Sequence, residues 1–326
     1  MERATTDVPK SSISKHRWQL LRSFIKDRNL NVQHKRSHAF GLFTSCKITD
    51  LKEVGFENVD DGCQVQNGYE WFQYSCGHFP DHQLAVRQRV RSVTWNDATG
   101  FDNTGNICVW PSEEILSYVC IKNSEDFRNK TVCELGAGMT GLAAMMLSIA
   151  SETGEVLITD GNMDGVTNLQ KIMKANNRKF GKTEVKIKQL RWNANEDFKD
   201  FENYFDYLLC ADCLFYEQVH DGLILVMKTL LKTEGMVLIV SPRRGSSVEH
   251  FVIKAQKWFD CEILENYDDF VWSKYCKEKE FSPSSEAVRN FPVLIKMRKK
   301  QDKENWVNII APHSLRPRIN YEALCR

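Results

Sequence analysis

Apolar and polar positions alternate along the middle of the chain in a way that predicts strands and helices in turn. Short apolar runs bounded by turn residues are typical of buried parallel strands. They fall at Thr131–Leu135, Glu155–Asp160, Val185–Leu190, Tyr207–Ala211 and Met236–Ser241. Segments with helical spacing separate or follow them, at Leu142–Ala150, Asp164–Asn176, Glu217–Leu231 and Val248–Phe259. This order predicts an α/β fold in which helices cover both faces of an open, mostly parallel sheet.

Two further strands are expected at Cys261–Glu265 and Pro292–Met297, separated by a long charged insertion. A late strand pair after a five-stranded doubly wound core suits a methyltransferase better than a dehydrogenase. We therefore expect a Rossmann-like, seven-stranded class I methyltransferase sheet within residues 101–298.

The N-terminal part of the chain predicts a smaller accessory region over residues 15–100, after a disordered start at 1–14. It opens with a basic amphipathic helix at Lys15–Arg28, whose apolar stripe includes Trp18. We favour packing of this helix on its own domain, with calmodulin or a membrane surface as alternative partners. The rest of the region is strand-like. After the main domain, residues 299–326 form a polar tail.

Two strands are the best candidates in the accessory region, at Glu70–Cys76 and Gln83–Val90. No chemical motif accompanies them. We therefore interpret this part as an accessory β-rich region and expect it to contribute to specificity.

Composition narrows the class of protein. A net charge of +1 gives no overall field that would attract nucleic acid or an anionic membrane. No apolar run approaches the roughly 20 residues of a membrane span.

Eleven cysteines at irregular spacing, with no signal peptide, indicate reduced thiols in a cytoplasmic or nuclear protein. We expect this protein to be a monomer. Cys210 and Cys213 form a C-x-x-C, but no second pair stands at zinc spacing, so no metal is expected.

The stretch from Val132 to Leu142 predicts a ligand-binding loop. It is a short strand that turns through Gly136 and Gly138 into a helix of small residues. Glycines permit positive φ and a close approach of the backbone to a ligand, and the following helix N-terminus offers free N–H groups. The spacing matches G-x-G-x-x-G, which is compatible with NAD or with S-adenosylmethionine.

Two acidic residues are relevant to the choice between NAD and S-adenosylmethionine as the cofactor. Asp160 ends the second strand about 20 residues past the loop, where it can accept hydrogen bonds from ribose hydroxyls of either cofactor. Glu134 lies at a position where dehydrogenases usually carry an apolar residue. A carboxylate there opposes a pyrophosphate and suits a sulfonium ligand that also carries an ammonium group.

Further candidates stand at other strand ends. Trp192 follows the third strand and could stack on adenine, although packing alone would explain a loop tryptophan. Asp212 and Phe215 follow the fourth strand, where a carboxylate and an aromatic ring could receive an amine. The Asn/Asp-Pro-Pro-Tyr motif of nucleic-acid base methyltransferases is absent from the sequence, which argues against a nucleic-acid substrate.

Several segments together resemble the protein-lysine branch of the seven-β-strand methyltransferases. These are Glu134–Leu142, Leu157–Asn162 and Cys210–Phe215. Within that branch, Phe101–Glu114, Ser241–Gly245 and Glu265–Asp268 resemble the calmodulin-lysine N-methyltransferase family. The resemblance covers roughly residues 101–297, with a looser match around the Trp18 helix.

The resemblance implies S-adenosylmethionine as cofactor, S-adenosylhomocysteine as product, and a calmodulin lysine methylated up to three times. By motif, the residues that would line the cofactor are Trp110, Gly136, Gly138, Asp160, Trp192 and Ala211. Asp212 would begin an Asp-x-x-Tyr motif, but this chain has Phe215 where relatives carry tyrosine. That excludes a hydroxyl role and leaves an aromatic wall.

Calmodulin is acidic, so a basic docking surface is expected. Arg243 and Arg244 follow the fifth strand and are our candidates for it, against a simple strand-end role. Three alternatives to a calmodulin methyltransferase stay open from the residues: a non-catalytic calmodulin-binding module, a nicotinamide dehydrogenase, and a methyltransferase for a lysine of another protein.

Overall fold

A computed structural model of the chain describes residues 40–57, 68–90, 109–283, 288 and 290–300. The expected disorder of residues 1–14, the basic helix at Lys15–Arg28, the segment 101–108 and the tail from 301 onward lie outside the described residues.

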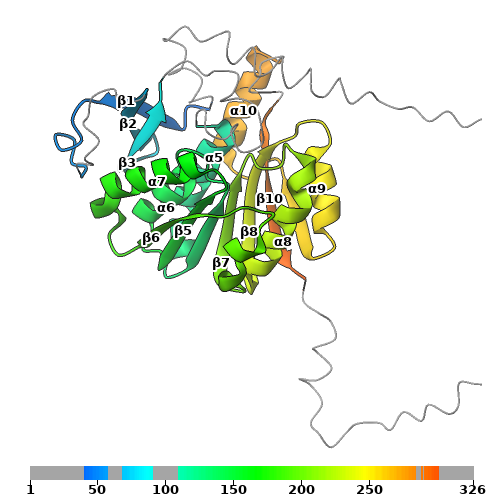
Figure 1. The fold of residues 1–326 in the computed structure, drawn as a ribbon. Helices are drawn as coiled ribbons and strands as arrows, with labels where there is room; N and C mark the ends of the chain where they lie inside the picture. The colour runs from blue at the N-terminus through cyan, green and yellow to red at the C-terminus, as the bar shows by residue number, and fades with distance from the viewer. Residues whose placement is uncertain (1–39, 58–67, 91–108, 284–287, 289, 301–326) are drawn as a thin grey trace, which may run out of the picture.

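The larger sheet has seven strands in the order β6-β5-β4-β7-β8-β10-β9 (Figure 1). Five strands run parallel: β4 (Thr131–Leu135), β5 (Glu155–Asp160), β6 (Glu184–Gln189), β7 (Phe205–Ala211) and β8 (Leu231–Pro242). Strand β10 (Pro292–Lys299) lies antiparallel to β8 and to β9 (Phe259–Leu264). The strand order reverses beside β4, which places the ligand crevice of such a sheet between β4 and β7. The predicted seven-stranded sheet is confirmed.

Helices cover both faces of this sheet, as predicted. One face carries α5 (Pro111–Lys122), α6 (Leu142–Ala150) and α7 (Met163–Asn176), and the other carries α8 (His220–Leu230) and α9 (Ser247–Ala255). The strands divide their side chains between the two faces. In β7, Leu209 joins the α5–α7 core, while Leu208 and Cys210 join the α8–α9 core. This alternation is the period of two that strand geometry imposes.

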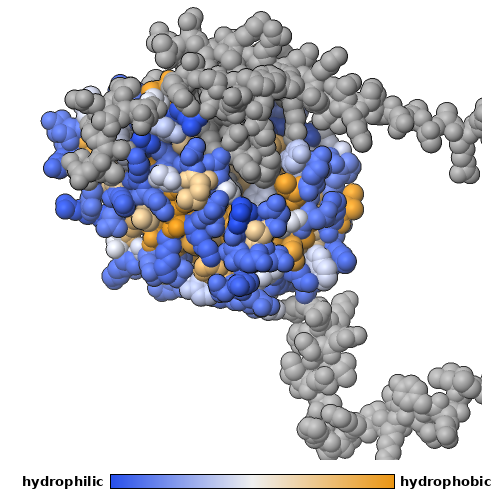
Figure 2. All heavy atoms as spheres, in the orientation of Figure 1, coloured by the Kyte–Doolittle hydropathy of each residue, from blue (hydrophilic) through white to orange (hydrophobic). Residues whose placement is uncertain are grey.

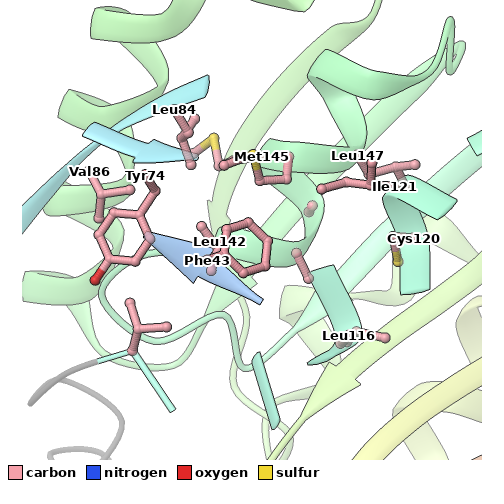
Figure 3. Packing of buried hydrophobic residues seen from close by; sticks show 14 of the residues in the cluster. Phe43, Tyr74, Leu84, Val86, Leu116, Cys120, Ile121, Leu142, Met145 and Leu147 are labelled. Atoms are coloured by element: carbon pink, nitrogen blue, oxygen red, sulfur yellow. The ribbon is translucent and has the colours of Figure 1, made fainter. Parts of the chain in front are cut away.

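A smaller antiparallel sheet packs on the α6–α7 side. It consists of β1 (Phe43–Ile48), β2 (Tyr69–Cys76) and β3 (Phe79–Arg89), joined in that order. Figure 3 shows Phe43, Tyr74 and Leu84 lying beside Met145 of α6, within one buried cluster. The accessory region is therefore an extension of the main core in its described part.

Two buried asparagines on α7 join that helix to the edge of the small sheet. Asn176 accepts a hydrogen bond from Ala85 N at 2.9 Å and donates one to Ala85 O at 2.8 Å. Asn168 accepts from Arg87 Nη1 at 2.8 Å and donates to Arg87 O at 2.9 Å. These amides satisfy backbone groups of β3 that would otherwise be buried without partners.

The charged insertion before β10, for which the sequence predicted no element, forms helix α10 (Asp269–Phe281). Val271 is the only fully buried residue of this helix, so it has no apolar stripe. The Asp268 side chain caps it by accepting from Val271 N at 2.9 Å. The prediction of a helix to Phe259 was also too long: α9 ends at Ala255, and Phe259 begins β9.

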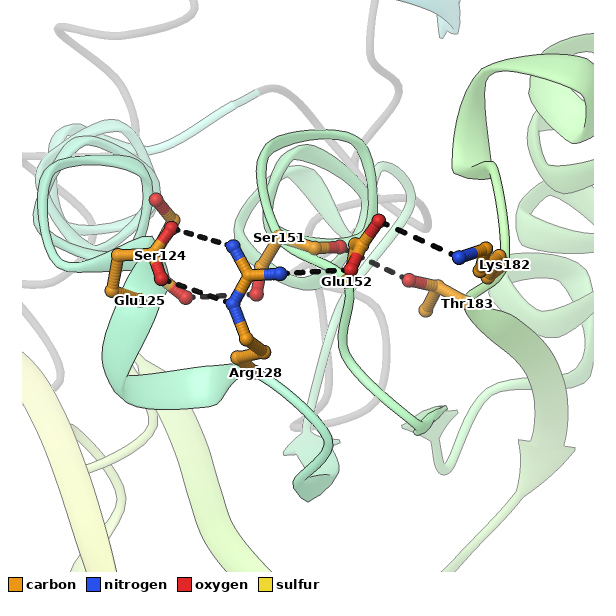
Figure 4. Close-up of polar contacts among 7 residues, drawn as sticks. All are labelled: Ser124, Glu125, Arg128, Ser151, Glu152, Lys182 and Thr183. Carbon is orange, nitrogen blue, oxygen red and sulfur yellow. Dashed lines mark hydrogen bonds and ion pairs between the residues drawn. The ribbon is translucent and has the colours of Figure 1, made fainter.

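The edge of the sheet where the parallel strands begin is held by exposed ionic contacts (Figure 4). Arg128 Nη1 bonds Glu152 at 2.8 Å, and Arg128 Nη2 bonds Glu125 at 2.9 Å. Exposed pairs of this kind contribute about 0–1 kcal/mol each. The described surface on the face of Figure 2 is mainly hydrophilic, with small separate apolar patches. Among described residues, no helix has the length and apolarity needed to cross a bilayer.

The Asn176 bridge generates a stability prediction. Replacing Asn176 by alanine leaves the N–H and C=O of Ala85 buried without these partners, so we expect a loss of about 1–3 kcal/mol in the free energy of unfolding. Urea unfolding measures it. The control is Asn177→Ala, at the exposed next position, which should change the value by no more than about 0.5 kcal/mol. Equal effects of the two substitutions would contradict the bridging role.

Candidate active site

The carboxyl ends of four parallel strands bring the predicted site residues to one edge of the sheet. Strand β4 ends before the glycine loop, β5 ends at Asp160, β7 ends at Ala211 and β8 ends before Arg243. Neighbouring registers fix these ends side by side: Leu135 pairs with Thr159, and Ala211 pairs with Val240. Ligands of open α/β sheets bind at such an edge.

The glycine loop has the backbone geometry that the sequence predicted. Gly136, Gly138 and Gly141 have φ of +69°, +60° and +55°. Residues other than glycine rarely adopt this left-handed conformation. A Cβ at Gly136 would lie 2.9 Å from Cys213 Sγ and 3.1 Å from Trp192 Cζ2. The loop after β4 is therefore packed directly against residues that follow β6 and β7.

The Asp160 side chain is hydrogen-bonded to the backbone of this loop. Its Oδ2 accepts a hydrogen bond from Gly138 N at 2.8 Å, and its Oδ1 accepts one from Asn162 N at 2.8 Å. Each carboxylate oxygen can accept a second hydrogen bond. The side chain is partly exposed, so Asp160 is fixed in position and has acceptor capacity for a hydroxyl-bearing ligand.

Glu113 and Glu134 support the loop from beneath, at the start of α6. Glu113 Oε1 accepts from Leu142 N at 2.9 Å and from the Thr140 hydroxyl. Glu134 Oε2 accepts from Ala144 N at 3.1 Å. Burial raises the pKa of Glu113 to about 7 and that of Glu134 to about 8, and repulsion from the Glu113 carboxyl adds to the shift of Glu134.

Sequence reasoning missed the role of Glu113. Its carboxyl serves two helices: Oε2 accepts from Trp110 N at 3.5 Å at the start of α5, and Oε1 accepts from Leu142 N at the start of α6. The available signal was burial: residues 112–121 of α5 are all buried, so a polar residue there must find a partner inside the protein. Glu134 also has this supporting position, and its predicted cofactor contact stays a prediction.

Asp212 is held in a strained, buried turn after β7. It has a φ of +54°, which is uncommon for a residue with a side chain, and its N–H donates to Val240 O at 2.9 Å. Its Oδ2 accepts from Arg244 Nη2 at 2.9 Å. Its Oδ1 is buried and has no hydrogen-bond partner among the described residues. Burial raises the pKa of the Asp212 carboxyl, while the Arg244 guanidinium lowers it.

The other residues that the sequence predicted for this site are three aromatic residues and an alanine. All four are partly buried: Trp110, Trp192, Ala211 and Phe215. The guanidinium carbon of Arg244 lies 5.9 Å from the centre of the Trp110 ring, so Arg244 stands between this ring and Asp212. The rings provide faces that attract cations.

The two arginines predicted to dock a substrate both have partners within the chain. Arg243 pairs with Glu249 at 3.2 Å and with Glu265, while Arg244 pairs with Asp212. The sequence did not predict the Arg244–Asp212 pair, since 32 residues separate the two. A docking role for Arg243 and Arg244 stays a prediction.

A groove of about 790 Å³ lies elsewhere. Its lining residues include Lys130, Asp206 and Lys300, at the edge where the parallel strands begin. Ligands of this fold class bind at the opposite edge, so we place the site at the glycine loop. The described residues contain no cluster of three or more metal-ligating side chains.

The fold and this edge define a class I methyltransferase: five parallel strands, a late antiparallel strand, a glycine loop after the first parallel strand and an acid after the second. A family model described as lysine methyltransferase matches residues 94–258. The calmodulin-lysine N-methyltransferase of Arabidopsis thaliana is 38% identical over 311 residues, which cover 89% of this chain and 98% of the plant protein. The chain belongs to the lysine methyltransferase family.

More distant proteins also match. Protein-lysine methyltransferase METTL21E of Mus musculus is 27% identical over 58% of this chain and 73% of its own length. The structure of TYW2 from M. jannaschii in complex with AdoMet aligns with a TM-score of 0.39 and 15% identity, over 67% of this chain and 83% of that one.

The buried glutamates generate a pH prediction. The pKa of Glu134 is about 8 in the folded protein and near 4.5 when unfolded, so the unfolded chain loses this proton first as pH rises. The free energy of unfolding should therefore fall between about pH 5 and pH 8, and Glu134→Gln should reduce that fall by at least about 1 kcal/mol.

Urea unfolding at several pH values measures the effect. The exposed Glu202→Gln is the matched control and should leave the slope of stability against pH unchanged. If Glu134→Gln and the natural protein lose stability in parallel across this range, the raised pKa is wrong.

Proposed function

We propose that this protein transfers methyl groups from S-adenosylmethionine to a lysine of calmodulin, up to trimethylation. The observation that carries the proposal is the meeting of the glycine loop, Asp160 and the buried Asp212 at one strand edge. The similarity to the plant calmodulin-lysine N-methyltransferase, over nearly the whole of that protein, supports calmodulin as the substrate.

The residues present fit S-adenosylmethionine. Gly136 and Gly138 have the left-handed φ that lets the backbone of this loop turn tightly, and a backbone without side chains at these positions allows a ligand to approach closely. Asp160 has acceptor capacity for ribose hydroxyls, and Trp192 would lie against the adenine side of the loop. Trp110 and Ala211 would line the remaining wall. When bound, the cofactor supplies a methyl group on a positively charged sulfur.

Asp212 would receive the substrate lysine. A lysine nitrogen must lose a proton before its lone pair can attack, and it must be aimed at the methyl carbon. The buried Oδ1 of Asp212 can accept a hydrogen bond from that nitrogen and so orient it. Phe215 and Trp110 would exclude water and stabilise positive charge with their ring faces.

We also propose that the protein works as a monomer in the cytoplasm, with the nucleus as a second location. In support, the cysteines of the described part, eight in number, are all free thiols, as expected in a reducing compartment.

Intact-mass spectrometry of unmethylated calmodulin tests the proposal. Incubation with this protein and S-adenosylmethionine should add about 14 Da for each methyl transferred, and Asp212→Ala should lower the rate at least about 100-fold because the amine loses its acceptor. The Asp212 variant should still bind S-adenosylhomocysteine. Transfer to a different protein but not to calmodulin would overturn the substrate, and binding of calmodulin without any transfer would favour a non-catalytic module.

The docking prediction can be tested at Arg243, which does not contact Asp212. Arg243→Glu should raise KM for calmodulin several-fold and weaken its dependence on salt, because one positive charge at the site edge becomes negative. The control is Arg128→Glu: this arginine is similarly exposed and also has two glutamate partners, but it lies at the opposite edge. Equal KM changes in both variants would argue against docking at Arg243.

A further inference from the structure

Arg244 has contacts that a docking residue does not need. Its side chain is 32% exposed, while the Asp212 carboxylate that it bonds is 9% exposed. Nη2 of Arg244 reaches only Oδ2 of Asp212, at 2.9 Å, and the described residues leave Oδ1 without a partner. The contact therefore leaves one carboxylate oxygen hydrogen-bonded to Arg244 and the other, which is buried, without a hydrogen-bond partner among the described residues.

We propose that Arg244 is a positioning residue: it keeps Asp212 ionised and turns Oδ1 toward the incoming lysine. The inference rests on the proposed function and assigns to Arg244 a role different from docking. The Arg244–Oδ2 bond persists while Oδ1 accepts a hydrogen bond from the lysine nitrogen. The proton that the lysine ammonium loses passes to solvent.

The physical need for this arrangement follows from burial. A carboxyl removed from water takes up a proton more readily, and a protonated Asp212 would bind a lysine ammonium weakly. The Arg244 guanidinium offsets that burial with a charge-assisted hydrogen bond. Arginine suits the task because it stays charged at all relevant pH values. The Trp110 ring, 5.9 Å from the guanidinium carbon, gives the arginine a second contact that restricts its orientation.

Other described groups near Asp212 do not substitute for Arg244. The titratable neighbour on the same turn is the thiol of Cys213, whose pKa is raised by Cys210, by burial and by the negative charge of Asp212. Arg243, the adjacent arginine, is bound to Glu249 and Glu265. The positive charge acting on the Asp212 carboxyl, among described residues, comes from Arg244.

The first test uses the protein without cofactor or substrate. The carbon-13 shift of the Asp212 carboxyl, assigned with Asp212→Asn, is followed against pH in the natural protein and in Arg244→Met. Loss of the guanidinium should raise the Asp212 pKa by at least about one unit, a tenfold change in proton affinity. Arg244→Lys keeps a cation and should recover part of that change. Superimposable titrations of the natural protein and Arg244→Met would overturn the proposal.

The second test uses the full reaction. In Arg244→Met the acid limb of the pH profile of kcat/KM should move to higher pH by the same amount, so the rate at pH values below the limb falls about tenfold and recovers as pH rises. A uniform loss at every pH would indicate a merely structural role and overturn the proposal. Arg243→Gln is the matched control: its acid limb should stay in place whatever happens to KM.

Folding and cofactor binding are checked separately. S-adenosylhomocysteine affinity should be unchanged in Arg244→Met, and in an Asp212→Asn background the Arg244 substitution should cost no further activity. An additional loss in that background would overturn the role through Asp212. If Arg244→Met does not fold, Arg244→Gln takes its place in both tests. If the natural protein methylates no lysine, the proposed function fails, whereas the cofactor-free titration still decides whether Arg244 controls Asp212.

Discussion

The hydrogen bonds that fix the loop between β4 and α6 are the constraint on which the site depends. The first N–H groups of a helix have no partner within the helix, and here buried carboxyl groups accept hydrogen bonds from two of them, Leu142 N and Ala144 N of α6. Glu113 comes from α5 and Glu134 from β4, while Asp160 holds the loop from β5. Three elements thus determine the path of one glycine-rich segment. Left-handed glycines allow that path, but the acids keep the chain on it.

The acids of the site differ in environment, and their chemistry differs accordingly. Glu113 and Glu134 are buried without a cationic partner among the described residues, so burial raises the pKa of each and favours the neutral form. Neutral carboxyls still accept hydrogen bonds from N–H groups, which is all that a supporting role requires. Asp212 is buried as well, and burial raises its pKa, but the Arg244 guanidinium beside it opposes that shift. Placement of one arginine therefore separates a carboxylate able to receive a cation from carboxyls that serve structure.

Much of the sheet could be predicted because most residues of β4, β5 and β8 are buried. Thr131–Leu135 and Glu155–Asp160 are continuous apolar runs between turn residues, and the structure has strands with those bounds. Helix α10 could not be predicted in the same way, since a largely exposed helix leaves no apolar stripe to detect. The supporting role of Glu113 and the Arg244–Asp212 pair could not be predicted for another reason. Both depend on contacts between residues about 30 positions apart, and local spacing does not report such contacts.

The small sheet also constrains the glycine loop, because a buried side chain makes hydrogen bonds to both. Asn168 of α7 donates to Arg87 O of β3 and also to Met139 O within the loop. One buried amide therefore ties the edge of the small sheet to the backbone of the cofactor cradle. Opening β3 away from α7 would leave the Arg87 and Met139 carbonyls without this donor, at a cost of about 1–3 kcal/mol for each buried group. Any ligand that requires the ordered loop must therefore also favour the docked small sheet, since binding and order are linked.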